Sequence, residues 1–229
     1  MKSRKPIIGI VARPENTEEI NFLVVVDSYG DAIIQSGGNP LVLLPPHIKD
    51  YGTINPKDME NLNDKQKQMI VDQINLCDGI LMPGGNKRYE FDRFIANYCI
   101  NNDIPVLGIC LGMQLLATHI NRDTLELTDD ALSHSKPGID KVHTVKLDKN
   151  SKLYSIIGEE EFYVNSRHKF KVTETGELSV VGCSGDGVIE AIEHKDKKFV
   201  IGVQWHPENL MDTSPSKKIF NCFIESCKR

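Results

Sequence analysis

Short apolar runs bounded by glycine or proline recur through the first half of this sequence, and they constrain the fold more than any other feature. They lie at residues 7–12, 41–44, 79–82 and 106–109. Runs of this length without polar interruptions are typical of strands buried on both faces of a parallel sheet. Amphipathic stretches long enough for crossover helices separate them, at residues 24–36, 65–76 and 89–100. The alternation predicts an α/β fold with a doubly wound, mainly parallel central sheet flanked by helices.

The second half of the chain has a different pattern. Short strands separated by polar turns are expected at residues 143–147, 162–164, 178–181, 188–193 and 199–203. They predict a smaller mixed or antiparallel β extension of the sheet. A last helix is expected at residues 214–227, with Ser214 as N-cap and Pro215 at the first helical position. The polar segment at residues 47–64 is interpreted as an exposed loop.

Length, charge and cysteine usage narrow the class of protein. The 229 residues are 40% hydrophobic and 26% charged, which suits a single domain over residues 1–229 with one core. A net charge of −5 with scattered basic residues favours neither nucleic acid nor an anionic membrane as partner. The first apolar run reaches Arg13 too early for a signal peptide, and no stretch could span a membrane, so we expect a cytoplasmic protein.

One cysteine occupies a place suited to a reactive thiol, whereas the six cysteines together show no zinc-binding spacing and are expected to be reduced. The apolar run at 106–109 leads into Gly108-Ile109-Cys110-Leu111-Gly112 and then into a helical pattern. Small residues on both sides favour a strained strand-to-helix turn, a nucleophile elbow, which projects the central side chain above the strand ends. The following helix would favour a thiolate, and the Leu111 N–H could donate to an oxyanion. Taken alone, the motif also fits a buried apolar cysteine or a phosphate-binding turn.

A histidine and a glutamate follow the last predicted strand, in Gln204-Trp205-His206-Pro207-Glu208. An extended backbone would place His206 and Glu208 on the same side, with Pro207 fixing the backbone between them. A carboxylate at that spacing can orient an imidazole and stabilise its protonated form. By itself the tripeptide also fits a surface turn. Together with the cysteine turn it indicates nucleophilic acyl chemistry.

A pair of glycines follows a third apolar run, in Pro83-Gly84-Gly85. Glycine is typical where the backbone approaches another group closely or adopts positive φ. An N–H of this loop could supply a second oxyanion donor. An ordinary tight turn is the alternative.

The three motifs, in this order and at these separations, resemble those of the class I glutamine amidotransferases. The resemblance implies a flavodoxin-like glutamine amidotransferase fold and attack of a cysteine on a γ-carboxamide, through a γ-glutamyl thioester. It implies that Cys110 is the nucleophile, His206 the base and Glu208 the residue that orients the base. The N–H groups of Leu111 and of the Gly84-Gly85 loop would form the oxyanion hole. No cofactor is expected.

Within that family, three further segments resemble the γ-glutamyl hydrolase branch, which includes γ-glutamyl-γ-aminobutyrate hydrolases. They are Pro6-Ile7-Ile8-Gly9-Ile10, the segment from Tyr29 to Pro40, and Val164-Asn165-Ser166-Arg167-His168. The chain departs from the branch in having Lys169 and Phe170 where a histidine and a glutamine are usual. It also has Asn86-Lys87-Arg88 where the branch has an aspartate and a long loop. Both departures fall where the leaving group would lie, so the resemblance implies the reaction type but no particular amine.

Several further residues are candidates for substrate binding. Gln114 lies one helical turn after Cys110, where its amide could face the glutamyl group or simply pack in the helix. The resemblance implies that Ser166 and His168, with Asn165 beside them, hold the glutamyl α-carboxylate and amine. A structural role is the alternative for His168.

No metal site is expected from the sequence. His134 and His143 flank a stretch rich in serine, lysine and proline, but a metal would require a third ligand that the sequence does not identify. We therefore interpret both as surface histidines.

The function expected is cysteine-dependent hydrolysis of a γ-glutamyl amide, which releases glutamate and an amine or ammonia. The expected partner is a small γ-glutamyl molecule. Two alternatives remain open. One is a glutaminase subunit that delivers ammonia to a separate synthase, and the other is an inactive binding or regulatory module on the same fold. The presence of all three catalytic residue types argues against the inactive module, and the oligomeric state is not specified.

Overall fold

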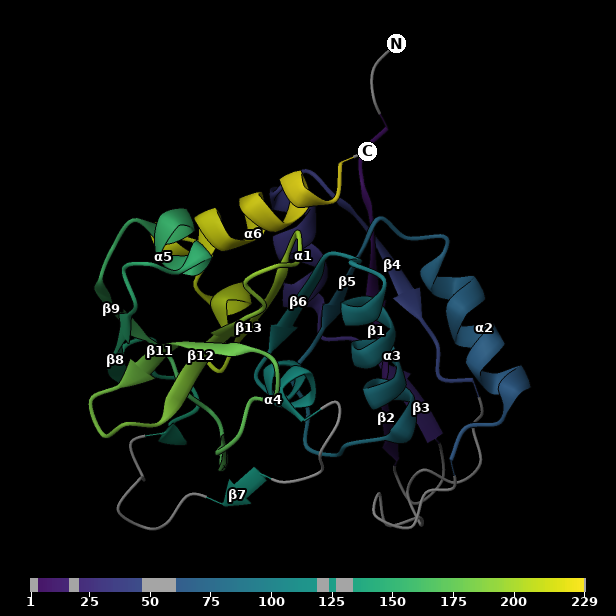
Figure 1. Ribbon diagram of the computed structural model, residues 1–229, viewed down its shortest axis with the longest axis horizontal. Helices are drawn as coiled ribbons and strands as arrows, with labels where there is room; N and C mark the ends of the chain where they lie inside the picture. Colours follow the sequence, from purple (N-terminus) through teal and green to yellow (C-terminus); the bar gives the residue numbers. More distant parts are fainter. Residues whose placement is uncertain (1–3, 17–20, 47–60, 119–123, 127–133, 229) are drawn as a thin grey trace.

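The largest sheet has nine strands, in the order β4-β1-β5-β6-β13-β12-β11-β8-β9. It is seen in a computed structural model that describes residues 4–16, 21–46, 61–118, 124–126 and 134–228 (Figure 1). The parallel half consists of β1 (Ile7–Val11), β4 (Asn39–Leu43), β5 (Gly79–Met82), β6 (Val106–Ile109) and β13 (Val200–Val203). The antiparallel half consists of β8 (His143–Leu147), β9 (Glu161–Val164), β11 (Ser179–Ser184) and β12 (Ile189–Glu193). The predicted parallel sheet with an antiparallel extension is confirmed.

Helices cover both faces of the sheet (Figure 1). One face packs against α1 (Asp27–Gln35), α5 (Lys152–Ile157) and α6 (Ser214–Ser226), and the other against α2 (Asp64–Ile74), α3 (Glu90–Asn101) and α4 (Leu111–Ala117). Successive residues of a strand pack into different cores, one on each face of the sheet. Leu81 lies in the core under α1, α5 and α6, whereas Ile80 and Met82 lie in the core under α2, α3 and α4. Every residue of β5, β6 and β13 is buried. Burial on both faces explains why these strands are continuous apolar runs.

Some elements differ from the sequence prediction. Two short antiparallel pairs, β2 (Arg13–Asn16) with β3 (Asn21–Val24) and β7 (Thr124–Glu126) with β10 (Phe170–Val172), were not expected because such short segments carry little periodicity. The first helix begins at Asp27 rather than at residue 24, because β3 continues to Val24. Of the segment predicted as a loop at 47–64, residues 47–60 lie outside the described part of the chain.

The start of α6 also differs. Its N-cap is Thr213 rather than Ser214, so Pro215 lies one position further into the first turn than expected. The Thr213 backbone is extended, and its hydroxyl donates to the Leu210 carbonyl at 2.7 Å instead of capping the helix. Proline remains compatible with this position, because the first-turn N–H groups have no intrahelical acceptor.

The strand order brings three chain segments to one edge of the sheet. In the parallel half, β5, β6 and β13 are neighbours, with Met82 opposite Gly108 and Ile109 opposite Val203. The chain leaves the carboxyl ends of these strands toward Gly84, Cys110 and His206 respectively. Ligands of doubly wound folds bind in the crevice at the carboxyl ends of the strands. The three sequence motifs therefore meet where this architecture usually places a site.

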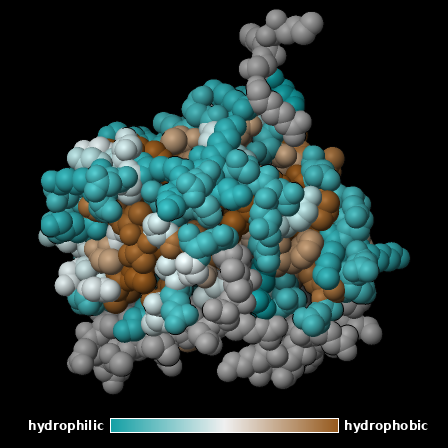
Figure 2. All heavy atoms as spheres, viewed as in Figure 1, coloured by the Kyte–Doolittle hydropathy of each residue, from teal (hydrophilic) through white to brown (hydrophobic). Residues whose placement is uncertain are grey.

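The surface of the face shown in Figure 2 is mainly hydrophilic, with hydrophobic atoms exposed over the antiparallel strands and again near β4 and α2. No helix in the described ranges is both long and apolar enough to cross a bilayer.

We predict that Gly112→Ala destabilises the fold, because a Cβ there would lie 2.0 Å from the carbonyl oxygen of Met82. The clash is with backbone, so the expected loss is about 2 kcal/mol or more in the free energy of unfolding. Gly30→Ala is the matched control, because this helical glycine has no atom within 4 Å of an added Cβ. That variant should gain about 0.5–1 kcal/mol. Urea unfolding measures both, and a Gly112→Ala protein as stable as the wild type would contradict the tight packing described.

Candidate active site

Cys110 lies in a strained turn between β6 and α4. Its backbone has φ 54° and ψ −105°, and glycine would be the usual residue at positive φ. The flanking glycines make the turn possible, since a Cβ on Gly108 would lie 2.7 Å from the backbone of Gly112. The Cys110 N–H donates to the Val203 carbonyl at 2.8 Å, which ties the turn to β13. The side chain is thus held at the strand ends, in the conformation expected of a nucleophile elbow.

His206 and Glu208 form a close pair at the end of β13. The distance between His206 Nδ1 and Glu208 Oε1 is 2.6 Å, and both residues are buried. The extended backbone from which their pairing was predicted is wrong, because Pro207–Asn209 form a short 3₁₀ helix, η3. This turn, rather than strand alternation, brings the carboxylate back to the imidazole. Asn209 Nδ2 also donates to Glu208 Oε1, at 3.0 Å.

The backbone of His206 is held from a second direction by Asn165. Asn165 Oδ1 accepts from the His206 N–H at 2.8 Å, and Asn165 Nδ2 donates to the His206 carbonyl at 2.9 Å. Asn165 is fully buried and follows directly after β9. The imidazole is therefore oriented by a carboxylate on its ring and by an amide on its main chain.

The charge state of His206 follows from these neighbours. Burial lowers its pKa, but the charge of Glu208 and hydrogen bonds with Cys110 and Glu208 outweigh this effect and raise the pKa to about 10. At neutral pH the imidazole is therefore protonated. A protonated histidine beside a cysteine favours the thiolate form of that cysteine.

The glycine loop lies between the cysteine and the histidine. A Cβ built on Gly84 would be 3.0 Å from His206 Cε1 and 3.5 Å from Cys110 Cβ. The Gly84 N–H donates to the Tyr29 hydroxyl at 2.9 Å, so it already has an acceptor. Gly85 adjoins Leu111, whose Cδ2 would be 3.1 Å from a Cβ at position 85. The Gly84 N–H is thus already engaged, and Gly85 packs beside Leu111.

Sequence reasoning missed three residues that support this loop: Arg13, Asp92 and Tyr29. Arg13 is buried, pairs with Asp92 and donates from Nη2 to the Pro83 carbonyl at 2.9 Å. Tyr29 is also buried, and burial, followed by the charge of Glu208, raises its pKa well above the usual value. A charged residue at the end of a buried strand was the available signal for Arg13. Tyr29 belongs to a segment that resembles the hydrolase branch, but the sequence does not mark it as a site residue.

The residues predicted to bind substrate divide into two groups. Gln114 accepts from Arg88 Nη2 at 3.0 Å and donates to Gln204 Oε1 at 3.1 Å, and Asn165 holds His206. Both lie beside the motifs predicted to be catalytic. The side chains of Ser166 and His168 instead contact His134, through a 2.7 Å bond to its carbonyl and a 3.2 Å approach to its Nδ1. Substrate binding by these four residues stays a prediction.

The interpretation of His134 and His143 as surface residues is wrong. The His134 side chain is 1% exposed and that of His143 is 12% exposed. The sequence pattern gave no indication of their neighbours, because His168 and the buried Glu190 come from distant segments. These four residues form a cluster on the antiparallel half of the sheet.

Known proteins similar to this chain include glutamine amidotransferase-like proteins and CTP synthases. The Peptidase C26 family matches residues 85–208. A glutamine amidotransferase-like protein of Rickettsia prowazekii is 28% identical over 98% of this chain and 98% of its own length. A CTP synthase of Chlamydia abortus is 30% identical over 71% of this chain, and the matched part is 36% of the synthase.

The fold has a counterpart among solved structures, and the family match includes the cysteine and histidine–glutamate motifs described above. The glutaminase domain of a Trypanosoma brucei CTPS, with bound acivicin, has a TM-score of 0.64 at 18% identity and covers 96% of this chain and 94% of its own. The family match spans more than half of the 229 residues and contains Cys110, His206 and Glu208. The chain therefore belongs to the Peptidase C26 family, a class I glutamine amidotransferase-like family, as the three motifs predicted.

Proposed function

We propose that this protein hydrolyses γ-glutamyl amide bonds, with Cys110 as nucleophile, His206 as general acid and base, and Glu208 as the residue that orients His206. The observation that carries the proposal is the 2.6 Å pair of His206 Nδ1 and Glu208 Oε1, placed beside the strained Cys110 turn. Membership of the family supports amide hydrolysis of the glutamine type in general. The γ-glutamyl specificity is the finer part of the proposal.

In the first half of the reaction the Cys110 thiolate attacks the γ-carbonyl carbon, and the carbonyl electron pair moves onto oxygen. The N–H groups of Leu111 and Gly85 are the proposed donors to this oxyanion. The Leu111 N–H belongs to the first turn of α4, where no intrahelical acceptor exists. Each such donor contributes roughly 3 kcal/mol to the stability of the transition state. As the oxyanion collapses, the C–N bond breaks and the His206 imidazolium gives its proton to the leaving nitrogen.

In the second half, neutral His206 takes a proton from water as the water attacks the thioester carbon. Collapse of the second oxyanion breaks the C–S bond and releases glutamate, and the Cys110 thiolate and the protonated His206 are restored. Glu208 keeps the ring oriented throughout and stabilises its charged form. General acid and base catalysis of this kind contributes about 10²- to 10⁴-fold to the rate.

The amine is the part of the substrate that the site residues constrain least. Exposed Lys87 lies in the loop after Gly85, and Arg88 reaches the Gln114 amide from the same loop. Cationic side chains at this point favour an acidic leaving group, and γ-glutamyl-γ-aminobutyrate is the substrate we would test first. A screen of γ-glutamyl amides, with free glutamate as the readout, tests this choice.

The CTP synthase relative favours a second candidate function, in which the protein supplies ammonia from glutamine to a separate synthase. The two candidates differ in their behaviour without a partner. A hydrolase acting alone turns over γ-glutamyl amines in purified form, whereas a partnered glutaminase should be almost silent with glutamine until its synthase is added.

We predict that Cys110→Ala abolishes turnover, by roughly 10⁴-fold or more, because no other group in the mechanism can form the thioester. Cys222→Ala is the matched control, because Cys222 is a partly buried thiol on α6, away from the strand ends. Glutamate release from the substrate set measures both variants. Substantial activity in Cys110→Ala would overturn the assignment of the nucleophile.

We predict that Glu208→Gln lowers the pKa of His206 and removes a pH-dependent part of the stability. The wild-type pKa of about 10 lies above the unfolded value of about 6.5, so the charged pair stabilises the folded state fully below pH ~6.5. This contribution is lost as pH rises through about 10. The difference in free energy of unfolding between wild type and variant should therefore be largest near pH 6 and shrink toward pH 10.

Urea unfolding across this range measures the effect, and Glu161→Gln provides the control because Glu161 is exposed. The free energy of unfolding of the control should differ from that of the wild type by the same small amount at every pH. A difference for Glu208→Gln that stays constant from pH 6 to 10 would contradict the proposed ion pair.

A further inference from the structure

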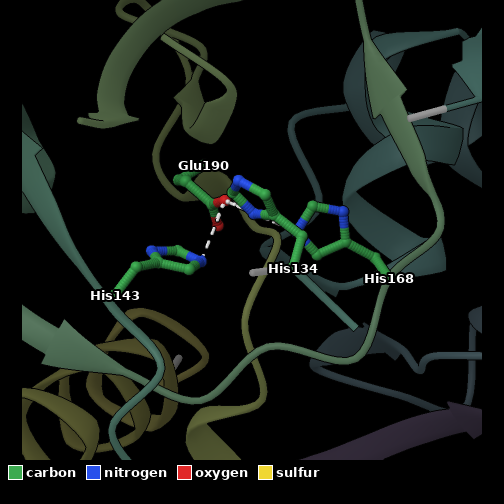
Figure 3. Close-up of side chains that lie close together, drawn as sticks. All are labelled: His134, His143, His168 and Glu190. Carbon is green, nitrogen blue, oxygen red and sulfur yellow. Dashed lines mark hydrogen bonds and ion pairs between the residues drawn. The ribbon is translucent and has the colours of Figure 1, made fainter. Parts of the chain in front are cut away.

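Three histidines and one glutamate converge inside the antiparallel half of the molecule. His143 begins β8, Glu190 lies in β12, His168 follows β9, and His134 precedes the bridge between Ser135 and Arg167. One ligand atom from each lies within 4.8 Å of all the others. Figure 3 shows the His134 and His143 rings turned toward the Glu190 carboxylate from opposite sides, with His168 beside His134.

The carboxylate at the centre of the cluster is buried completely. Glu190 is 0% exposed, and the side chains of His134 and His168 are each 1% exposed. An ionised carboxylate inside a protein requires a compensating positive charge.

The outer nitrogen of each histidine is already bonded. His134 Nε2 lies 2.9 Å from Asp186 Oδ2, His168 Nδ1 lies 3.0 Å from the Phe170 carbonyl, and His143 Nδ1 lies 3.2 Å from the Thr144 carbonyl. Carboxylate and carbonyl oxygens only accept, so each outer nitrogen carries the proton. In a neutral imidazole the inner nitrogen then has a lone pair. Outer bonds of this kind orient and select the tautomer of metal-binding histidines.

Three of the inner atoms lack the hydrogen bonds that their burial would demand, whereas His134 Nδ1 and His168 Nε2 lie within hydrogen-bonding distance of each other. Neither oxygen of Glu190 nor Nε2 of His143 has a hydrogen-bond partner among the described residues. Yet Glu190 Oε1 lies 3.2, 3.4 and 3.5 Å from the inner nitrogens of His134, His168 and His143. The atoms are close but not aligned as donor and acceptor. Lone pairs that face a carboxylate repel it, unless a proton or a metal ion lies between them.

The distances among the inner nitrogen and oxygen atoms also fit a single ion bound at their centre. Four ligands bound tetrahedrally at about 2.0–2.1 Å lie about 3.3 Å from one another. The three nitrogen-to-oxygen distances span 3.2 to 3.5 Å, and the inner nitrogens of His134 and His168 are 3.2 Å apart. Four of the six distances among the inner atoms thus have the size expected in a first coordination sphere, and all six are within 4.8 Å.

We propose that His134, His143, His168 and Glu190 bind one divalent transition-metal ion, with zinc best suited to this set of three imidazoles and a carboxylate. Imidazole and carboxylate ligands bind zinc, iron, nickel and manganese, so they select among these metals less strongly than thiolates do. Four protein ligands in a tetrahedron favour zinc. Four protein ligands leave no open position, which indicates a structural role.

The ion would fix a loop that also supports the proposed active site. Ser166 Oγ and the His168 N–H both donate to the His134 carbonyl, at 2.7 and 2.9 Å. Asn165, next to Ser166, holds the backbone of His206. Ligation of His134 and His168 therefore stabilises the segment that positions His206. This link to catalysis rests on the proposed function, whereas the metal site does not.

The test uses the full chain without a histidine tag, stripped with a chelator and then titrated separately with Zn²⁺ and Co²⁺. We expect one ion per chain by elemental mass spectrometry, a higher melting temperature with zinc, and the visible absorption bands of tetrahedral cobalt. His143→Gln and Glu190→Gln should each weaken binding roughly tenfold or more. His143 is the more exposed ligand, so its variant is expected to fold.

His194→Gln is the matched control, because His194 is a buried histidine that pairs with Glu177 outside the cluster. It should keep one ion per chain with wild-type affinity. The proposal is overturned if the wild type takes up neither ion and its melting temperature is unchanged, the result expected if protons alone balance the cluster. It is also overturned if His143→Gln binds as tightly as the control. Metal content is independent of turnover, so an inactive protein that binds zinc would count against the proposed function only.

Discussion

The first turn of α4 lies against the carboxyl end of β5 so closely that a Cβ at position 112 would be 2.0 Å from the Met82 carbonyl oxygen. This contact forces the chain to turn sharply after β6, and Cys110 takes up the bend at φ 54°. A non-glycine residue in such a conformation costs roughly 1–3 kcal/mol. Every residue of α4 is buried, and that packing offsets the cost. The strained cysteine is therefore a consequence of how tightly helix and sheet fit together.

The sheet register converts that local turn into a site. Because β13 pairs in parallel with β6, with Val203 opposite Ile109, the segment after β13 leaves the sheet next to Cys110. The η3 turn then returns Glu208 to the His206 ring, while Asn165 holds the His206 backbone from the antiparallel half. The parallel half thus supplies the proposed nucleophile and the antiparallel half fixes its base. Both halves of the sheet are therefore needed to hold His206 beside Cys110.

Buried charge is balanced differently in the two halves. Near the glycine loop, Arg13 pairs with Asp92 and also donates to the Pro83 carbonyl, so its charge orients the backbone beside the proposed oxyanion site. In the antiparallel half, Glu190 faces three imidazoles whose outer nitrogens are occupied by other acceptors. In the first arrangement the two opposite charges come from the same chain and pair directly. The second has the donor atoms and spacing of a cation site, and the loop from Asn165 to His168 connects it to His206.

The sequence by itself determined the apolar strands and the elbow at Cys110, because each is encoded in a short contiguous pattern, and it identified His206 and Glu208 as a pair although the η3 turn that joins them was not predicted. Buried strands are apolar on both faces, and a tight strand-to-helix turn requires glycines at fixed spacing. Only the tertiary structure decided the rest. It showed that Gly84 is already bonded to Tyr29, that Arg13 supports Pro83, and that His134, His143 and His168 meet at Glu190. These groups come from segments far apart in the chain, and a single sequence carries no signal for contacts that depend on strand order and register.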